Sequence, residues 1–146
     1  MAAMLENMLQ RHTTAYARLI TGEIAIERGR MGDGIEAFRD AQKRHDSWFG
    51  RFLLGKAYVE AGHFPEALAE LDLCVKRRGE TADVFFNDIP TLRYLPAAYY
   101  WLGRSQEGVG AASEAKKAYE QFLGLRGEAN PSDPLAADAK RRISAL

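Results

Sequence analysis

The sequence is poor in the residues that metal, redox and disulfide-bonded proteins depend on. Cys74 is the only cysteine, so no disulfide can form within the chain and no cysteine-based metal site is expected. The only histidines are His12, His45 and His63, and no two of them have the spacing of three or four residues that is typical of metal ligands. We therefore expect no metal, no cofactor and no catalytic residue, and interpret the chain as a non-enzymatic protein.

An excess of charge of either sign is also missing. Twenty Lys and Arg residues balance twenty Asp and Glu residues, and the balance holds over both halves of the chain. A protein that binds nucleic acid usually carries a basic excess that neutralises phosphates, and an anionic membrane surface attracts the same excess. We therefore expect neither a nucleic acid nor a membrane as a partner.

Two kinds of apolar segment are absent as well. The N-terminus, Met1–Asn7, has no basic region followed by an apolar run, so it does not resemble a secretory signal. No run of about 18 apolar residues predicts a membrane span. These absences indicate a soluble cytoplasmic protein, although a chain cut from a larger protein would also lack its targeting signal.

What the sequence does contain is a repeated block. The second block follows the first after 33 residues, and the third follows the second after 48. Each has a glycine, a second glycine seven residues later, a small residue at twelve and a large apolar residue at sixteen. The matching positions are Gly22, Gly29, Gly34 and Phe38; Gly55, Gly62, Ala67 and Leu71; and Gly103, Gly110, Ala115 and Tyr119.

Each block predicts two helices joined by a glycine turn. A left-handed backbone conformation closes a helix at low cost only at glycine, and the second glycine of each block stands at that point. The expected first helices are 15–28, 48–61 and 96–109, and the expected second helices are 31–44, 64–77 and 112–125.

The first glycine of each block lies inside a helix, where it costs about 1 kcal/mol relative to alanine. Three such costs at equivalent places are explained if the two helices of a block approach closely there. The small residue at twelve is then the expected contact, which pairs Gly55 with Ala67.

The segment Leu54–Leu68 resembles the tetratricopeptide-repeat consensus. Paired helices repeated at 33 or 34 residues are typical of that family. The resemblance implies an all-α fold, a right-handed α-solenoid of three helical hairpins with a C-terminal capping helix, and a scaffold that binds other proteins. The implied division is 1–14 as an N-terminal helix or cap, 15–47, 48–81 and 96–129 as repeats, 82–95 as an apolar insertion and 134–146 as the capping helix.

A narrower resemblance concerns the third block. Asn87–Pro96, Tyr99–Gly108 and Asp133–Ala139 are similar to tetratricopeptide segments appended to bacterial Ser/Thr protein kinases. None of the catalytic motifs of a kinase is present. This likeness implies a bacterial protein that works beside such an enzyme and is not one itself.

Two segments outside the repeats allow alternative interpretations. The insertion either extends the preceding helix and packs down as a lid, or presents Phe85 and Phe86 to a partner. Apolar residues at helical spacing near the N-terminus, Met4, Leu5, Met8 and Leu9, either cap the first repeat or form an edge that dimerises.

The first helices of the repeats are expected to line a concave groove that binds a peptide. Its apolar floor with two cations would suit a peptide with apolar anchors and an acidic group that meets Lys56 or Arg104. The alternative is a structural or oligomerisation module, in which the aromatic residues only pack repeat on repeat and the groove is covered by the chain itself or by a second copy. The candidate residues are Tyr16, Leu19, Glu23, Phe49, Phe52, Lys56, Val59, Tyr100, Arg104 and Glu107.

One family specificity is not expected here. Tetratricopeptide domains that hold the C-terminal carboxylate of heat-shock chaperones use Lys and Asn on the first repeat, and the matching residues of this chain are Leu19 and Glu23. A carboxylate would meet repulsion at Glu23, so the resemblance implies another partner.

Overall fold

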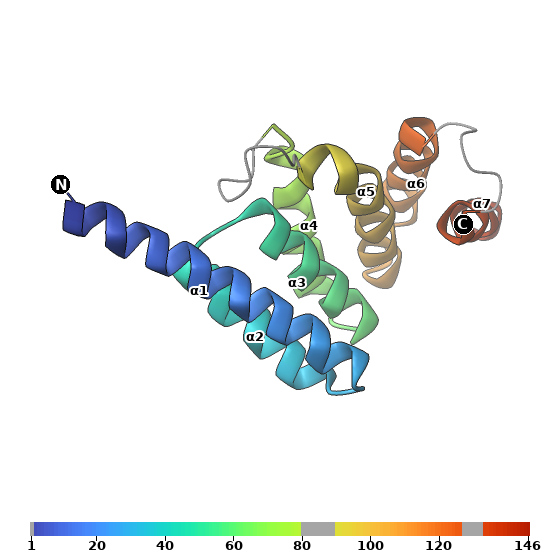
Figure 1. Cartoon of the computed structure of the whole chain (residues 1–146). Coiled ribbons are helices and arrows are strands. Elements are labelled where there is room, and N and C mark those ends of the chain that lie inside the picture. Colours follow the sequence, from blue (N-terminus) through green and yellow to red (C-terminus); the bar gives the residue numbers. More distant parts are fainter. Residues whose placement is uncertain (1, 80–89, 127–132) are drawn as a thin grey trace.

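A computed structural model describes residues 2–79, 90–126 and 133–146 (Figure 1). Every regular element in these ranges is an α-helix, and no strand occurs among them. Phe85 and Phe86 of the predicted insertion lie outside the described residues. The helices are α1 (Ala2–Glu27), α2 (Met31–Arg44), α3 (Trp48–Glu60), α4 (Phe64–Lys76), α5 (Pro90–Gly108), α6 (Ala112–Arg126) and α7 (Pro134–Ala145).

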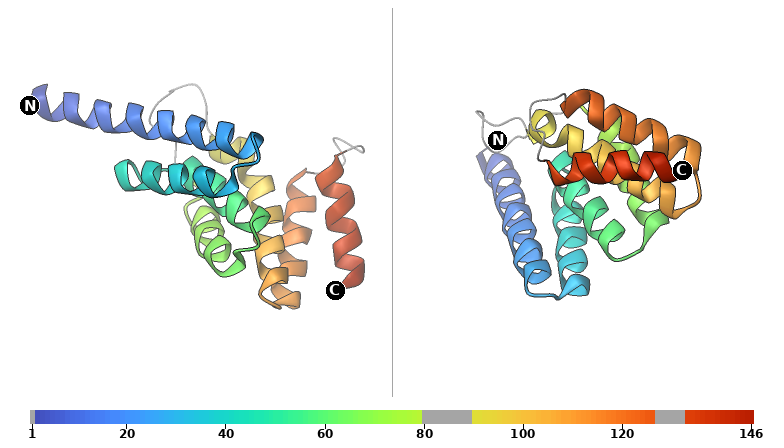
Figure 2. Two further views of the ribbon diagram at one scale, coloured as in Figure 1. Left: turned by 90° about the horizontal axis from the view of Figure 1, so that it is seen from below. Right: turned by 90° about the vertical axis from the view of Figure 1, so that its right-hand side faces the viewer.

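The first six helices form three hairpins, and each hairpin packs on the next. The pairs are α1 with α2, α3 with α4, and α5 with α6, while α2 contacts α3, and both α3 and α4 contact α5. Helix α7 lies alongside α6 at the end of the stack (Figure 2). The prediction of an all-α solenoid of three hairpins with a final covering helix is therefore confirmed.

The three predicted glycine turns have one geometry. Gly29, Gly62 and Gly110 have φ values of 76°, 78° and 81°. At each turn the amide of the following residue donates to the carbonyl five residues earlier, as Arg30 does to Ala25 over 2.9 Å. This pattern satisfies the carbonyls at the helix end, which is why the same short turn closes the first helix of every hairpin.

The glycines inside the first helices lie where the two helices of a hairpin touch. A Cβ atom added to Gly55 would stand 2.6 Å from Leu71 Cγ, and one added to Gly103 would stand 2.7 Å from the Tyr119 ring. The predicted close approach is confirmed, but at Gly55 and Gly103 its expected partner is wrong, because the glycine receives the large residue sixteen positions later. In the first hairpin the small residue at twelve also lies close, since the Gly34 carbonyl oxygen is 3.1 Å from the Cβ position of Gly22.

The N-terminal segment departs from the predicted division. Residues 2–14 and the first helix of repeat one form a single helix, α1, which extends past the end of α2 (Figures 1 and 2). The expected N-terminal segment is thus helical but not a separate element, and its contact with the first repeat is at His12, whose ring lies 3.8 Å from that of His45. Its apolar side chains are exposed instead, at 70% for Met4, 56% for Leu5, 46% for Met8 and 66% for Leu9.

The insertion departs from the prediction at its C-terminal end. Residues 90–95 belong to α5 and lengthen the first helix of the third hairpin, whereas the sequence suggested an extension of the preceding helix. The helix begins six residues before the start expected from the repeat spacing, so Pro96 lies inside it. As a consequence, Tyr94 becomes part of the same helical face as Ala97.

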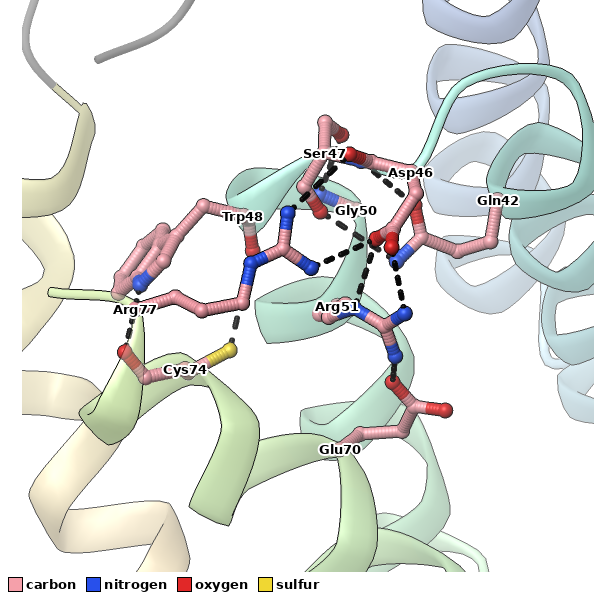
Figure 3. Close-up of polar contacts among 9 residues, drawn as sticks. All are labelled: Gln42, Asp46, Ser47, Trp48, Gly50, Arg51, Glu70, Cys74 and Arg77. Carbon is pink, nitrogen blue, oxygen red and sulfur yellow. Dashed lines mark hydrogen bonds and ion pairs between the residues drawn. The ribbon is translucent and has the colours of Figure 1, made fainter. Parts of the chain in front are cut away.

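A polar cluster fixes the first hairpin relative to the second (Figure 3). The Asp46 carboxylate accepts hydrogen bonds from Arg51 at 2.7 and 2.8 Å and from Arg77 at 2.9 Å. The Trp48 indole donates to the Cys74 carbonyl at 2.7 Å, and Arg51 also reaches Glu70 at 2.6 Å. Groups from the α2–α3 turn, α3 and α4 thus share one network, which orients α3.

The glycine contacts predict a stability difference between two Gly-to-Ala changes. Gly103→Ala should lower the free energy of unfolding by about 1–3 kcal/mol, because the methyl group would overlap the stiff Tyr119 ring. Gly124→Ala is the matched control, since that exposed α6 glycine has no atom near its Cβ position, and it should raise the same quantity by about 0.5–1 kcal/mol. Urea unfolding measures both; equal effects would contradict the nested-helix interpretation.

The junction predicts a pH-dependent effect of Asp46→Asn. Burial raises the pKa of Asp46, but hydrogen bonds from Arg51 and Arg77 outweigh it and hold this pKa below the ordinary value of 3.8. The carboxylate therefore stabilises the fold at neutral pH and loses this effect as pH falls through its folded pKa.

At neutral pH the change should cost about 1 kcal/mol, a modest value because Asp46 is half exposed. The difference in unfolding free energy between wild type and variant should shrink below pH 3.8. A difference that stays constant on acidification would contradict the assignment.

Candidate functional site

A cleft opens between the first helices of the three hairpins, with a volume of about 370 Å³. Helix α3 supplies its base, α1 and α5 its sides, and α7 one residue at its end. We call it the inner cleft, and its lining residues are Glu23, Phe49, Phe52, Leu53, Lys56, Glu60, Tyr94, Ala97, Trp101 and Leu135.

Aromatic rings form the apolar part of the inner cleft. The Tyr94 ring lies 5.1 Å from Phe49 and 5.4 Å from Phe52, centroid to centroid. Phe52 is only 4% exposed, whereas Phe49, Tyr94 and Trp101 are half-buried. Partly exposed aromatic rings on a rigid helical base offer large contact area at low conformational cost, which is typical of protein-binding surfaces.

Charged groups gather on the other side of the cleft. Lys56 Nζ lies 3.8 Å from Glu60 and 5.9 Å from the centre of the Trp101 ring, so this ammonium has both an anionic and an aromatic neighbour. Glu23 on α1 faces the same space. An adjoining hollow of about 100 Å³ shares Glu23, Lys56 and Glu60 and adds Glu27.

Four of the ten predicted groove residues line the inner cleft: Glu23, Phe49, Phe52 and Lys56. The other six do not line it. Leu19 and Val59 are each 3% exposed and pack inside the solenoid, and Tyr16 is half-buried against the same core. Tyr100, Arg104 and Glu107 face α7.

Helix α7 packs over the residues with which the third repeat was expected to line the groove. The Tyr100 hydroxyl donates to Asp138 at 2.8 Å, and Arg142 donates to both oxygens of Glu107 at 2.9 Å. Arg104 donates to the Tyr100 hydroxyl at 3.4 Å. Of the two cations expected in the groove, Lys56 lines the inner cleft and Arg104 does not.

The contacts around α7 also shift the pKa values of Tyr119 and Asp138. Burial raises the pKa of Tyr119, and the hydrogen bond that its hydroxyl donates to Glu107 raises it further. Burial would raise the pKa of Asp138, but Arg142 and Tyr100 outweigh burial and lower it. The Asp138 carboxylate is thus held in its ionised form, and its bond to Tyr100 ties α7 to α5.

Six lining residues are not among the ten candidates: Leu53, Glu60, Tyr94, Ala97, Trp101 and Leu135. A signal for two of them was present, since Leu53 and Trp101 both stand two residues before the signature glycine. The residues chosen instead, three before that glycine, are Leu19, Phe52 and Tyr100, and all three are buried. In the third repeat the lining residue is therefore Trp101 in place of Tyr100, whereas in the second repeat both Phe52 and Leu53 line the cleft.

Chemical groups of other kinds are not assembled in the described ranges. No cluster of three or more His, Cys, Asp or Glu side chains able to hold a metal occurs there. Cys74 is fully buried, and burial raises the pKa of its thiol to about 12, so the reactive thiolate is suppressed. None of the described helices has both the length and the apolar character needed to cross a membrane.

Solved structures with the same arrangement carry related names. A TPR-like protein from Chlorobium tepidum superposes with a TM-score of 0.74 at 20% identity, over 96% of this chain and 98% of that one. Residues 97–125, within α5 and α6, match the tetratricopeptide repeat family. The fold is that of a tetratricopeptide-repeat domain.

Two further tetratricopeptide domains of this shape were solved with peptides. The first domain of Spaghetti (RPAP3) bound to the HSP90 peptide SRMEEVD has a TM-score of 0.70 at 20% identity, over 92% of this chain and 93% of that one. The second domain of human RPAP3 with the HSP70 peptide SGPTIEEVD has a TM-score of 0.70 at 17% identity, over 92% and 98%. A sequence comparison with curated proteins gave no match.

The contacts of α7 predict different effects for two neighbouring arginines. Arg142→Met should lower the free energy of unfolding by about 1–2 kcal/mol, because partly buried Glu107 and Asp138 each lose a charge-assisted hydrogen bond. Arg141→Met removes an arginine that is 76% exposed and should change stability by less than about 0.5 kcal/mol. Urea unfolding distinguishes them, and similar losses for both would contradict this docking of α7.

Proposed function

We propose that this chain is a non-enzymatic protein-interaction module that binds a segment of another protein in the inner cleft. The observation that carries the proposal is the row of half-buried aromatic rings, Phe49, Tyr94 and Trp101, beside exposed carboxylates in a preformed hollow. Such a surface offers apolar anchoring and polar selection together. The peptide complexes of two domains with the same fold support a protein ligand.

The partner we propose differs in chemistry from the peptides of those two domains. Both of those peptides end in Glu-Glu-Val-Asp, an acidic sequence. In this chain Glu23 is exposed in the cleft and Leu19 is buried in the core. An acidic C-terminus would therefore meet a carboxylate at Glu23, and we propose a different class of segment.

The two tryptophans of the chain provide a test with a built-in control. Trp101 lines the inner cleft, whereas the Trp48 indole is 4% exposed and hydrogen-bonded to Cys74. Short random peptides displayed on phage would be selected on the immobilised chain, and winners titrated into isotope-labelled protein. The indole N–H resonance of Trp101 should shift with peptide concentration while that of Trp48 stays in place.

Assignments of the two indole signals would come from Trp48→Phe and Trp101→Phe variants. Selected peptides that leave Trp101 unmoved and shift signals of α2, α4 or α6 would place binding on the convex face. That outcome, or a failure to select any peptide, would overturn the proposal.

A second candidate function, homodimerisation, is favoured by the projecting half of α1. Its apolar residues Met4, Leu5, Met8 and Leu9 are 46–70% exposed and continue the α1 surface that packs on α2. Glu6 and Arg11 cancel in charge, so two copies of this segment meet without net repulsion. We propose a second copy of the chain as the occupant of this face.

Sedimentation velocity tests this second candidate. Wild type should sediment as a dimer at micromolar concentration, and Leu5→Glu with Leu9→Glu should give a monomer of unchanged thermal stability. Asn7→Glu with Gln10→Glu adds the same charge at exposed polar positions of α1 and should leave the dimer intact. A monomeric wild type, or equal dissociation by both pairs, would contradict the candidate.

The kinase context stays a prediction. The similarity of Asn87–Pro96 to segments appended to bacterial Ser/Thr protein kinases falls partly on residues outside the described ranges. The lid alternative for 82–95 also stays a prediction, because only 90–95 of that segment lie in the described ranges, as part of α5.

A further inference from the structure

We infer that the inner cleft selects partner segments that carry a Lys or Arg side chain next to apolar residues. The inference rests on the proposed function and adds the charge class of the ligand. It reverses the expectation from the sequence, which placed an acidic ligand group against Lys56 and Arg104.

The first argument is the balance of charge. The inner cleft and its adjoining hollow are lined by Glu23, Glu27 and Glu60 against Lys56, so three negative charges and one positive charge give a net charge of −2. Lys56 is the only cation among their lining residues within the described ranges. A cleft with one sign of charge and low-dielectric walls focuses its field on an incoming ligand.

The second argument is the state of each charge. The Lys56 ammonium lies beside Glu60 and over the Trp101 ring, so its positive charge is already partly compensated in the absence of a ligand carboxylate. Glu23 and Glu27 are exposed, and no cation of the described ranges forms an ion pair with either. The groups left to meet a ligand are therefore carboxylates, which accept charge-assisted hydrogen bonds from a guanidinium or an ammonium.

The third argument is the shape of a basic side chain. Lys and Arg carry an apolar stem that packs along apolar surface while the charged end stays in a polar environment. In the inner cleft the Trp101 and Tyr94 rings border the space that Glu23 faces. A stem laid across these rings brings its charge toward the α1 carboxylates, and the rings add a cation–π attraction.

The neighbouring arginines do not change this balance. Arg93 lies over the Tyr94 ring at 5.5 Å and is not a lining residue of the cleft. Arg104 interacts with the Tyr100 hydroxyl at the α7 interface. Arg142 is bound by Glu107 and Asp138, so its charge is neutralised within the third hairpin and α7.

The test compares the charge composition of selected peptides. Phage-displayed random peptides would be selected on wild type and on the double variant Glu23→Lys with Glu27→Lys. Both positions are exposed, so the variant should fold as wild type does. Wild type should enrich Lys and Arg and deplete Asp and Glu, and the variant should lose or reverse that bias.

A single winning peptide would then be synthesised with its basic residue and with Gln in its place. Glu23→Lys should lower the affinity for the basic peptide by about tenfold or more, and should lower the affinity for the Gln peptide much less. Glu120→Lys is the matched control on α6, exposed and remote from the cleft, and it should leave both affinities unchanged. High salt should weaken the basic peptide preferentially.

The outcomes separate the inference from the proposed function. Peptides that shift the Trp101 signal but show no enrichment of Lys or Arg, or that bind the Glu23→Lys variant equally well, would overturn the inference alone. If no selected peptide shifts the Trp101 signal, the proposed function is overturned, and the inference that rests on it is overturned as well.

Discussion

The close contact inside each hairpin is the constraint from which the rest of the structure follows. Phe38, Leu71 and Tyr119 each project from a second helix into space that a side chain at Gly22, Gly55 or Gly103 would occupy. Packing against a missing side chain fixes both the separation and the rotation of the two helices. In the first two hairpins the residue after that glycine is then held on the inner side, which is how Glu23 and Lys56 come to face one cleft.

The sequence was informative where structure depends on neighbours along the chain. Glycine turns at Gly29, Gly62 and Gly110 are local signals, because a positive φ excludes most other residues there. The positions of the three hairpins along the chain could be predicted from these turns. The rotation of each helix could not be read in the same way, since it depends on how a large side chain such as Leu71 seats on the opposite helix.

The candidate site was half predicted for the same reason. Glu23 and Lys56, one position after the glycine, were placed correctly, but Arg104 at the same position of the third repeat was not, and buried Tyr100 was chosen in place of Trp101. The position of α7 was also beyond local reasoning, because its Arg142 meets Glu107 from 35 residues away. With that contact, Glu107 lies against α7, and the third repeat contributes only Ala97 and Trp101 of α5 to the cleft.

The projecting half of α1 has a consequence for how the chain unfolds. In a stacked array each element is stabilised by its neighbours, so cooperativity extends only as far as contacts do. Helical residues without a packed neighbour rely on propagation from the adjoining turn, and a short isolated helix is marginal in water. Residues 4–11, which are all exposed, therefore form a separate unit that opens at lower free energy than the hairpins, and any surface that covers them would extend the cooperative unit of the fold along α1.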